Sequence, residues 1–144
     1  MKRFFLFFFL GILSFTSITA QDIYDSVKAE IIANKLTAGK IISRQEAQNA
    51  VNFALIGISK TRSEGDRLLD LYPEGSDWVK FHKYFESVEK EYSASFVIIH
   101  NVEKFKKLLP DKDYAKLTIA LRDYHEWYSL FCQKQKRLSG CPYD

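Results

Sequence analysis

Two long series of apolar residues, spaced alternately three and four positions apart, constrain the fold more than any other feature of this chain. They lie on either side of Pro110. Such spacing places side chains along one stripe of an α-helix, as in the seam of a coiled coil. A proline ring cannot continue a helix built on the residues before it. The pattern therefore predicts two long helices, at about 77–109 and 111–137, that pair as an antiparallel hairpin.

Two further helices are predicted before this hairpin. Apolar residues at helical spacing mark the segment 22–38. Ser43 and Glu46 have the spacing of a capping box, in which each side chain accepts a hydrogen bond from the other residue's amide. The helix that they open carries apolar residues up to Ile58, whereas 61–75 is consistent with a short helix or a turn. The chain is thus predicted to be all-α, with about four helices in an up-down bundle.

Residues 1–20 have the three-part layout of a secretory signal peptide. A short basic start precedes an apolar run over 4–18, and small residues follow up to Ala20. The run is shorter than the roughly 20 apolar residues that a membrane-spanning helix needs. We therefore expect cleavage between Ala20 and Gln21, although a retained anchor is the alternative. The expected product is a single helical domain over 21–144, periplasmic or secreted, without a stable membrane anchor.

Loss of the leader changes the charge of the protein. The formal net charge falls from +3 to +1, because Lys2 and Arg3 are removed and 19 basic residues remain against 18 acidic ones. Binding to nucleic-acid phosphates needs concentrated positive charge, so no nucleic-acid partner is expected. The basic residues cluster before Pro110 and near the C-terminus, where they suit helix C-terminal ends. The alternative is contact with an acidic partner or with phospholipid head groups. These clusters are Lys104, Lys106 and Lys107, and Lys134, Lys136 and Arg137.

Cys132 and Cys141 are the only cysteines. In an oxidising compartment, a pair at this spacing predicts one disulfide that closes the loop 132–141. Two free thiols are the alternative. The bond requires the last helix to end near Lys136 and the chain to reverse at Gly140.

No catalytic or metal-binding pattern appears in the sequence. The three histidines, His82, His100 and His125, have no acidic residue three positions before them, as a di-metal bundle would require. A Gly-x-Ser-x-Gly turn and a Gly-rich phosphate loop are also absent from the sequence. We therefore predict a protein that is not an enzyme and that needs no metal or cofactor.

The leading hypothesis is an exported binding protein for a protein partner, such as an envelope assembly, a secretion apparatus or a toxin that it neutralises. It requires an apolar strip that faces solvent once the core is filled. The candidates lie on or beside the two seams and are Ile98, Phe105, Trp127 and Leu130. The sequence does not specify an oligomeric state.

Two alternatives remain open. The aromatic residues beside the seams most simply fill the core, but they are also consistent with a carrier of an apolar small ligand. The candidate cavity residues are Phe85, Tyr92, Tyr124 and Tyr128. The second alternative is a hydrolase of envelope polymers, which requires two carboxylates that converge in a cleft.

Overall fold

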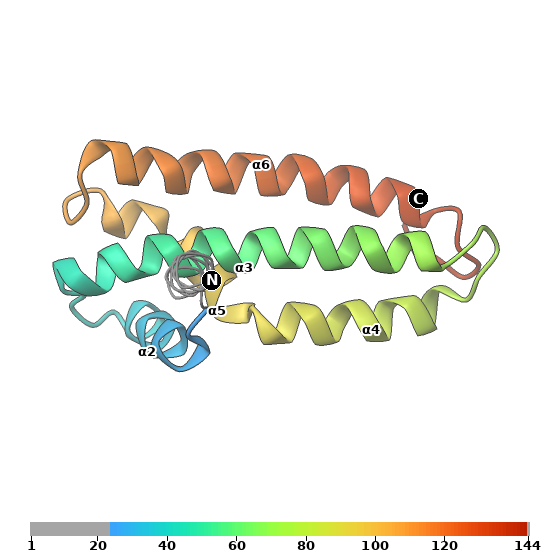
Figure 1. Ribbon diagram of the computed structural model, residues 1–144, viewed down its shortest axis with the longest axis horizontal. Helices are drawn as coiled ribbons and strands as arrows, with labels where there is room; N and C mark the ends of the chain where they lie inside the picture. The colour runs from blue at the N-terminus through green and yellow to red at the C-terminus, as the bar shows by residue number, and fades with distance from the viewer. Residues whose placement is uncertain (1–23, 144) are drawn as a thin grey trace, which may run out of the picture.

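The computed structural model describes residues 24–143, which form an all-α bundle without a named β-strand in that range (Figure 1). The predicted all-α class is therefore confirmed. The predicted signal peptide and its cleavage site at Ala20 and Gln21 lie outside the described residues. Among those described, no helix combines the length and apolar character needed to cross a membrane. The elements are α2 (Ser26–Thr37), α3 (Arg44–Leu71), α4 (Trp78–Glu91), α5 (Ser93–His100), the 3₁₀-helix η1 (Val102–Phe105) and α6 (Asp111–Gln135).

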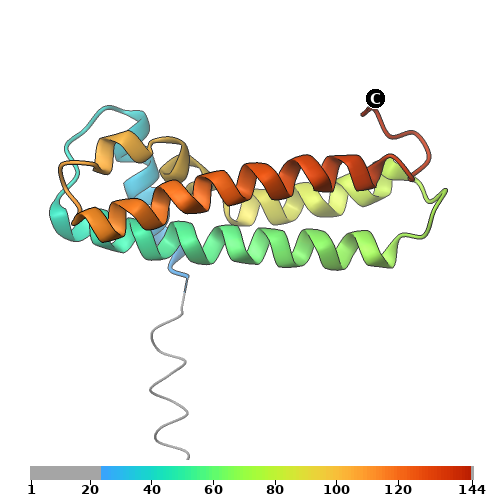
Figure 2. The same ribbon diagram turned by 90° about the horizontal axis from the view of Figure 1, so that it is seen from above.

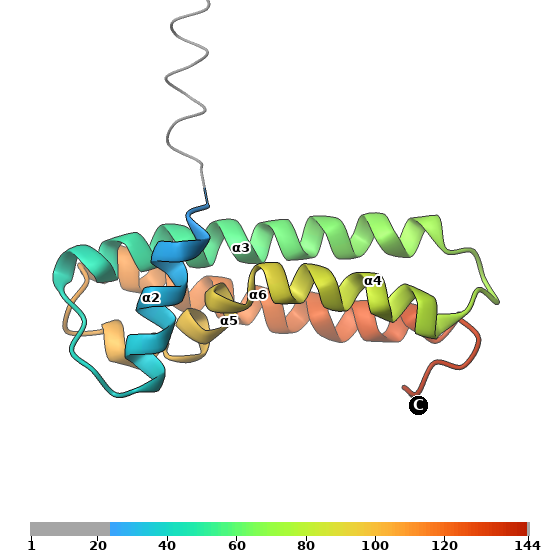
Figure 3. The same ribbon diagram turned by 90° about the horizontal axis from the view of Figure 1, so that it is seen from below.

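Three long helices, α3, α4 and α6, lie side by side and give the molecule its elongated shape (Figure 1). Helices α3 and α6 run in the same direction, and α4 runs opposite to both. Seen from above, α6 passes in front of both partners (Figure 2). Helix α2 crosses the bundle near one end, where it packs against α5 (Figure 3). The bundle thus departs from the predicted up-down order, because α3 and α6 are parallel and α2 crosses one end.

Helix α3 begins at the predicted capping box. The Ser43 hydroxyl accepts a hydrogen bond from the Glu46 amide (3.1 Å), and the Glu46 carboxylate accepts one from the Ser43 amide (2.9 Å). Both bonds satisfy amide groups that the first helical turn leaves without partners. The helix then continues to Leu71, so the segment 61–75, for which a short helix or a turn was expected, mostly extends α3.

The expected helix over 77–109 is divided into α4, α5 and η1, whereas α6 begins directly after Pro110 as predicted. The division at Tyr92 allows α5 to pack against both α2 and α3. Helix α5 ends at His100, where polar side chains bond to backbone carbonyl groups one turn earlier. Asn101 donates to the Val97 carbonyl (2.8 Å), and such local bonds compete with continued helix. Apolar spacing continues through both breaks and therefore does not reveal them.

The core consists of two clusters of buried side chains. The first lies where α2, α5 and η1 meet the beginnings of α3 and α6, and it is rich in alanine and aliphatic residues. The second lies between the far halves of α3, α4 and α6 and is largely aromatic. Its buried aromatic members are Phe81, Phe85, Tyr124, Trp127 and Phe131. Aromatic rings fill the wide space between three long helices.

Candidate functional site

The predicted partner-binding strip is wrong for three of its four residues. Ile98 and Phe105 are 0% exposed and Trp127 is 9% exposed, so none of them can face a partner. Only Leu130 lies at the surface, with 56% exposure. The strip was expected to remain at the surface once the four predicted helices had filled the core. In the structure Ile98 and Phe105 pack beneath α2 and α3 in the first core cluster, and Trp127 is enclosed by the aromatic rings of the second.

The structure does not bring the four predicted cavity residues together. Tyr124 and Tyr128 contact each other on α6, with ring centroids 5.8 Å apart. Phe85 packs against Phe131 (4.7 Å) in the aromatic core. Tyr92 lies at the α4–α5 junction and contacts Tyr24 instead (5.1 Å). Rings of the second core cluster thus occupy the space around Phe85.

A groove of about 370 Å³ lies elsewhere, between the parallel helices α3 and α6. Its apolar side chains come from both helices, and one of them, Ile119, remains 48% exposed. Four polar side chains stand among them at helical spacing. The residues that line it are Leu55, Ile58, Ser59 and Arg62 from α3, and Lys116, Ile119, Ala120 and Asp123 from α6. The apolar spacing of the sequence did not predict this site, because its lining residues come from α3 and α6, which that spacing did not pair.

Within the described part of the chain, two of the three charged residues that line the groove form ion pairs, and the third, Arg62, does not. Lys116 forms an ion pair with Asp113 (3.2 Å), and Asp123 forms one with Arg122 (2.9 Å). Asp113 also accepts a hydrogen bond from Gln48, and this bond together with Lys116 lowers the pKa of Asp113. Arg62 forms no ion pair with any described residue. The groove therefore offers one half-buried guanidinium group to an incoming acidic group.

The groove does not hold the carboxylate pair that the hydrolase alternative requires. Asp123 is the only carboxylate among its lining residues, so the pair of converging carboxylates required by the hydrolase alternative is not formed there. Over the described residues, no group of three His, Cys, Asp or Glu side chains is placed to hold a metal ion. His100 and His125 approach each other across α5 and α6, with ring centroids 5.8 Å apart, whereas His82 stacks on Trp78.

One cation of each basic cluster bonds to a carbonyl group near a helix end. In both cases that helix is not the one that had been expected, which precedes the cation in the sequence. Lys104 donates to the carbonyl of Leu36 at the end of α2 (2.9 Å). Arg137 donates to the carbonyl of Leu69 near the end of α3. A cation bonded to a terminal carbonyl group stabilises a helix through the negative end of its dipole. The sequence shows the cations but not which helix each one reaches.

Cys132 and Cys141 are free thiols in the structure, so the predicted disulfide is not formed there. The chain nevertheless ends its last helix and reverses as the predicted bond requires. Helix α6 ends at Gln135, and the chain reverses at Gly140, whose φ of +77° favours glycine. Burial raises the pKa of Cys132, hydrogen bonds with Tyr128 and Tyr143 lower it, and the nearby Cys141 raises it slightly.

Comparisons with known proteins do not assign this chain to a family. No protein-family model, no curated protein and no solved structure matches it.

Proposed function

We propose that this protein is an exported, non-catalytic binding protein that holds a protein partner in the groove between α3 and α6. The observation that carries the proposal is the groove itself, where apolar side chains surround a guanidinium group without an ionic partner. An apolar centre with a charged rim is the usual anatomy of a protein interface. Export would bring the protein into contact with envelope assemblies, a secretion apparatus or toxins, which are the candidate partners.

The form of the groove favours a protein over a small ligand. Small-molecule sites bury most of the ligand surface in a concave pocket. Here Ile119 forms one wall and is about half exposed, so a bound molecule keeps one side in solvent. A segment of a partner protein with one large apolar side chain and a neighbouring carboxylate fits this arrangement. The carboxylate would pair with Arg62, for which a two-pronged ion pair is the strongest geometry.

A photo-crosslinking amino acid at Ser59 tests this proposal, because Ser59 lines the groove and is exposed. We expect it to form one discrete covalent adduct with a host protein in the exported fraction. The same crosslinker at Tyr84, an exposed residue of α4 outside the groove, is the control and should form no such adduct. Native mass spectrometry of the purified protein distinguishes a protein partner from a lipid-sized ligand.

Substitutions in the groove complete this experiment. Ile119→Asp and Arg62→Glu should each weaken capture of the crosslinked partner at least about tenfold, which corresponds to about 1.4 kcal/mol. The matched control is Val79→Asp, which changes an exposed apolar residue of α4 in the same way and should leave capture unchanged. Equal adducts at Ser59 and Tyr84, or full capture by Ile119→Asp, would show that the groove is not the binding site.

Export also predicts the state of the cysteines. In an oxidising compartment, Cys132 and Cys141 should form a disulfide that ties the C-terminal segment to α6. The intact mass of the exported protein should then lie two hydrogens below that of the dithiol form, and reduction should restore them. The mass also reports cleavage between Ala20 and Gln21. A Cys141→Ser variant is the control, and a wild-type mass equal to the dithiol form would exclude the bond.

A further inference from the structure

The excess positive charge of the described chain is concentrated at one end of the bundle. Residues 35–46 and 102–116 carry eight cations and four carboxylates, a formal charge of +4, whereas the other described residues carry eleven cations and twelve carboxylates, a formal charge of −1. We call this region the basic end. It contains the end of α2, the first turn of α3, η1 and the beginning of α6. The near-neutral net charge of the sequence hides this asymmetry.

Most of the cations at the basic end are exposed to solvent and have no carboxylate partner within the described protein, so they can contact an external anionic group. Six of them are exposed and form no ion pair with a described residue. One of the six, Lys104, donates to the Leu36 carbonyl, which leaves five free cations. Three of the four carboxylates are engaged: Glu46 with Lys35, Asp113 with Lys116, and Glu103 as acceptor from the Tyr114 hydroxyl (3.1 Å). Asp111 is the remaining one. The five free cations are Lys40, Arg44, Lys106, Lys107 and Lys112.

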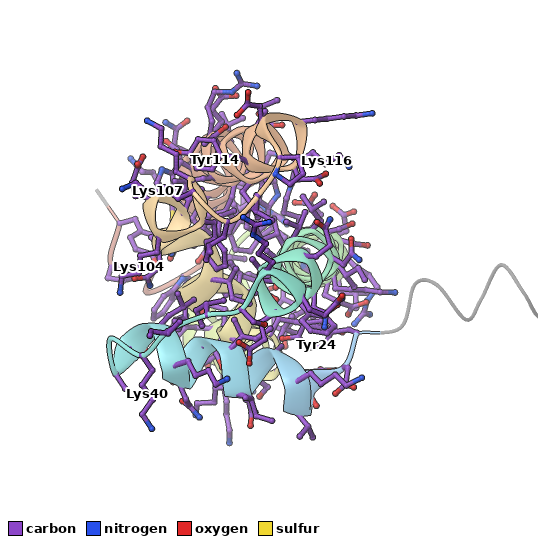
Figure 4. The ribbon with its side chains drawn as sticks, turned by 90° about the vertical axis from the view of Figure 1, so that its left-hand side faces the viewer. Tyr24, Lys40, Lys104, Lys107, Tyr114 and Lys116 are labelled. Atoms are coloured by element: carbon purple, nitrogen blue, oxygen red, sulfur yellow. The ribbon has the colours of Figure 1, made fainter. Side chains whose placement is uncertain are left out.

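Several cations of the basic end lie near one another on the surface. Viewed from this end, Lys40 and Lys107 lie along the same edge as Lys104, which is bonded to the Leu36 carbonyl (Figure 4). Arg44 and Lys107 also line a shallow groove of about 380 Å³, none of whose lining residues is acidic. The segments that supply these side chains are distant in the sequence, so only the fold brings them together. The other basic cluster, around Lys136, lies at the opposite end of α6.

An isoleucine projects from the middle of this charge. Ile41 is 91% exposed, the largest exposure among the large apolar residues described, and it stands between Lys40 and Arg44 on the loop before α3. A single exposed apolar residue is ordinary on a protein surface. Flanked by unpaired cations, however, it has the composition of a membrane-contacting loop, in which cations meet head groups and an aliphatic side chain enters between them.

We propose that the basic end docks on an anionic phospholipid surface, with Ile41 inserted between the head groups. A lipid surface suits these residues better than a protein does. Lysine, which supplies four of the five free cations, acts as a flexible point charge for scattered phosphates. A protein hot spot instead favours clustered aromatic and arginine side chains around a desolvated centre. The inference is independent of the α3–α6 groove, which is lined by none of the five free cations.

Vesicle sedimentation tests the proposal. It uses the purified exported protein, whose N-terminus and cysteine state are established by its intact mass. The protein should bind vesicles that contain phosphatidylglycerol, should not bind pure phosphatidylcholine vesicles, and should lose binding as salt rises from about 0.05 to about 0.5 M. Each cation near an anionic membrane strengthens binding by about fivefold. The triple variant Lys40→Glu, Lys106→Glu, Lys107→Glu should therefore bind at least about a hundredfold more weakly. Ile41→Ser should weaken binding severalfold.

The matched control removes the same charge from the other end. Lys83→Glu, Lys134→Glu, Lys136→Glu changes three exposed lysines without described ion pairs and should retain vesicle binding. Thermal melting confirms that both triple variants remain folded. Absence of binding to anionic vesicles, or an equal loss in both triple variants, would overturn the proposal. If the basic-end variant binds vesicles normally but loses the crosslinked partner, this surface contacts an acidic protein instead.

Discussion

Replacing Trp127 by alanine is expected to lower the free energy of unfolding by about 3–5 kcal/mol, the range for removing a buried large aromatic side chain. The indole ring stacks on Phe131 with centroids 4.6 Å apart and also contacts Phe85 (6.4 Å). Its Nε1 group donates a hydrogen bond to the Asp66 carboxylate on α3 (3.0 Å). The truncation therefore leaves a cavity between three helices and removes a polar link between α3 and α6.

The neighbouring Leu130 supplies the control for this experiment. Its side chain is 56% exposed, and Leu130→Ala should change the free energy of unfolding by less than about 0.5 kcal/mol. Urea denaturation monitored by circular dichroism measures both variants. Both residues were predicted from the sequence to face a partner, so the comparison separates core from surface. If Trp127→Ala is as stable as the wild type, the Trp127 side chain does not stabilise the core and is again a candidate for partner binding.

Gly57→Ala is expected to destabilise the protein by about 2–3 kcal/mol, within the range for overpacking a tight core. A Cβ atom at Gly57 would lie 1.9 Å from the Oγ atom and 2.5 Å from the Cβ atom of Ser95. Ser95 cannot simply turn away, because its hydroxyl donates to the Phe53 carbonyl on α3 (2.9 Å) and its Cβ atom is fixed to the backbone. Helices α3 and α5 must therefore separate at their crossing.

Helix propensity by itself predicts the opposite sign for this substitution. Alanine is favoured over glycine in a helix interior by about 1 kcal/mol. The steric clash should outweigh this preference, and Ser95→Gly in the Gly57→Ala background should recover part of the lost stability, since it removes both clashing atoms. A double-mutant cycle measured by urea denaturation gives the coupling energy. An increase in stability on Gly57→Ala would show that the two helices do not meet this closely.

Local signals in the sequence predicted the ends of several elements correctly. The capping box at Ser43 begins α3, Pro110 precedes α6, and Gly140 reverses the chain with a positive φ. Each signal acts through atoms within a few residues of itself, so the rest of the fold does not alter it. The apolar spacing also predicted that the stripe before Pro110 is buried, and Phe81, Phe85 and other residues of that stripe do lie in the core.

Long-range features escaped prediction for a common reason. The division at Tyr92 and the burial of Ile98 and Phe105 depend on α2 and α3 packing over α5 and η1, which periodicity along one helix cannot show. The length of α3 was also underestimated. Its glycines Gly57 and Gly65, which weaken an isolated helix, are retained where other side chains need the space.

The all-α class, the hairpin break and the capping of α3 depend on side-chain spacing and local hydrogen bonds, so they could be predicted from the chain alone. Which residues remain exposed and which charges meet depends instead on how the helices pack. The parallel packing of α3 and α6 creates the groove around Arg62 and Ile119, and the crossing of α2 assembles the basic end around Ile41. Both surfaces join segments far apart in the chain, and contacts between such segments arise only when the helices pack.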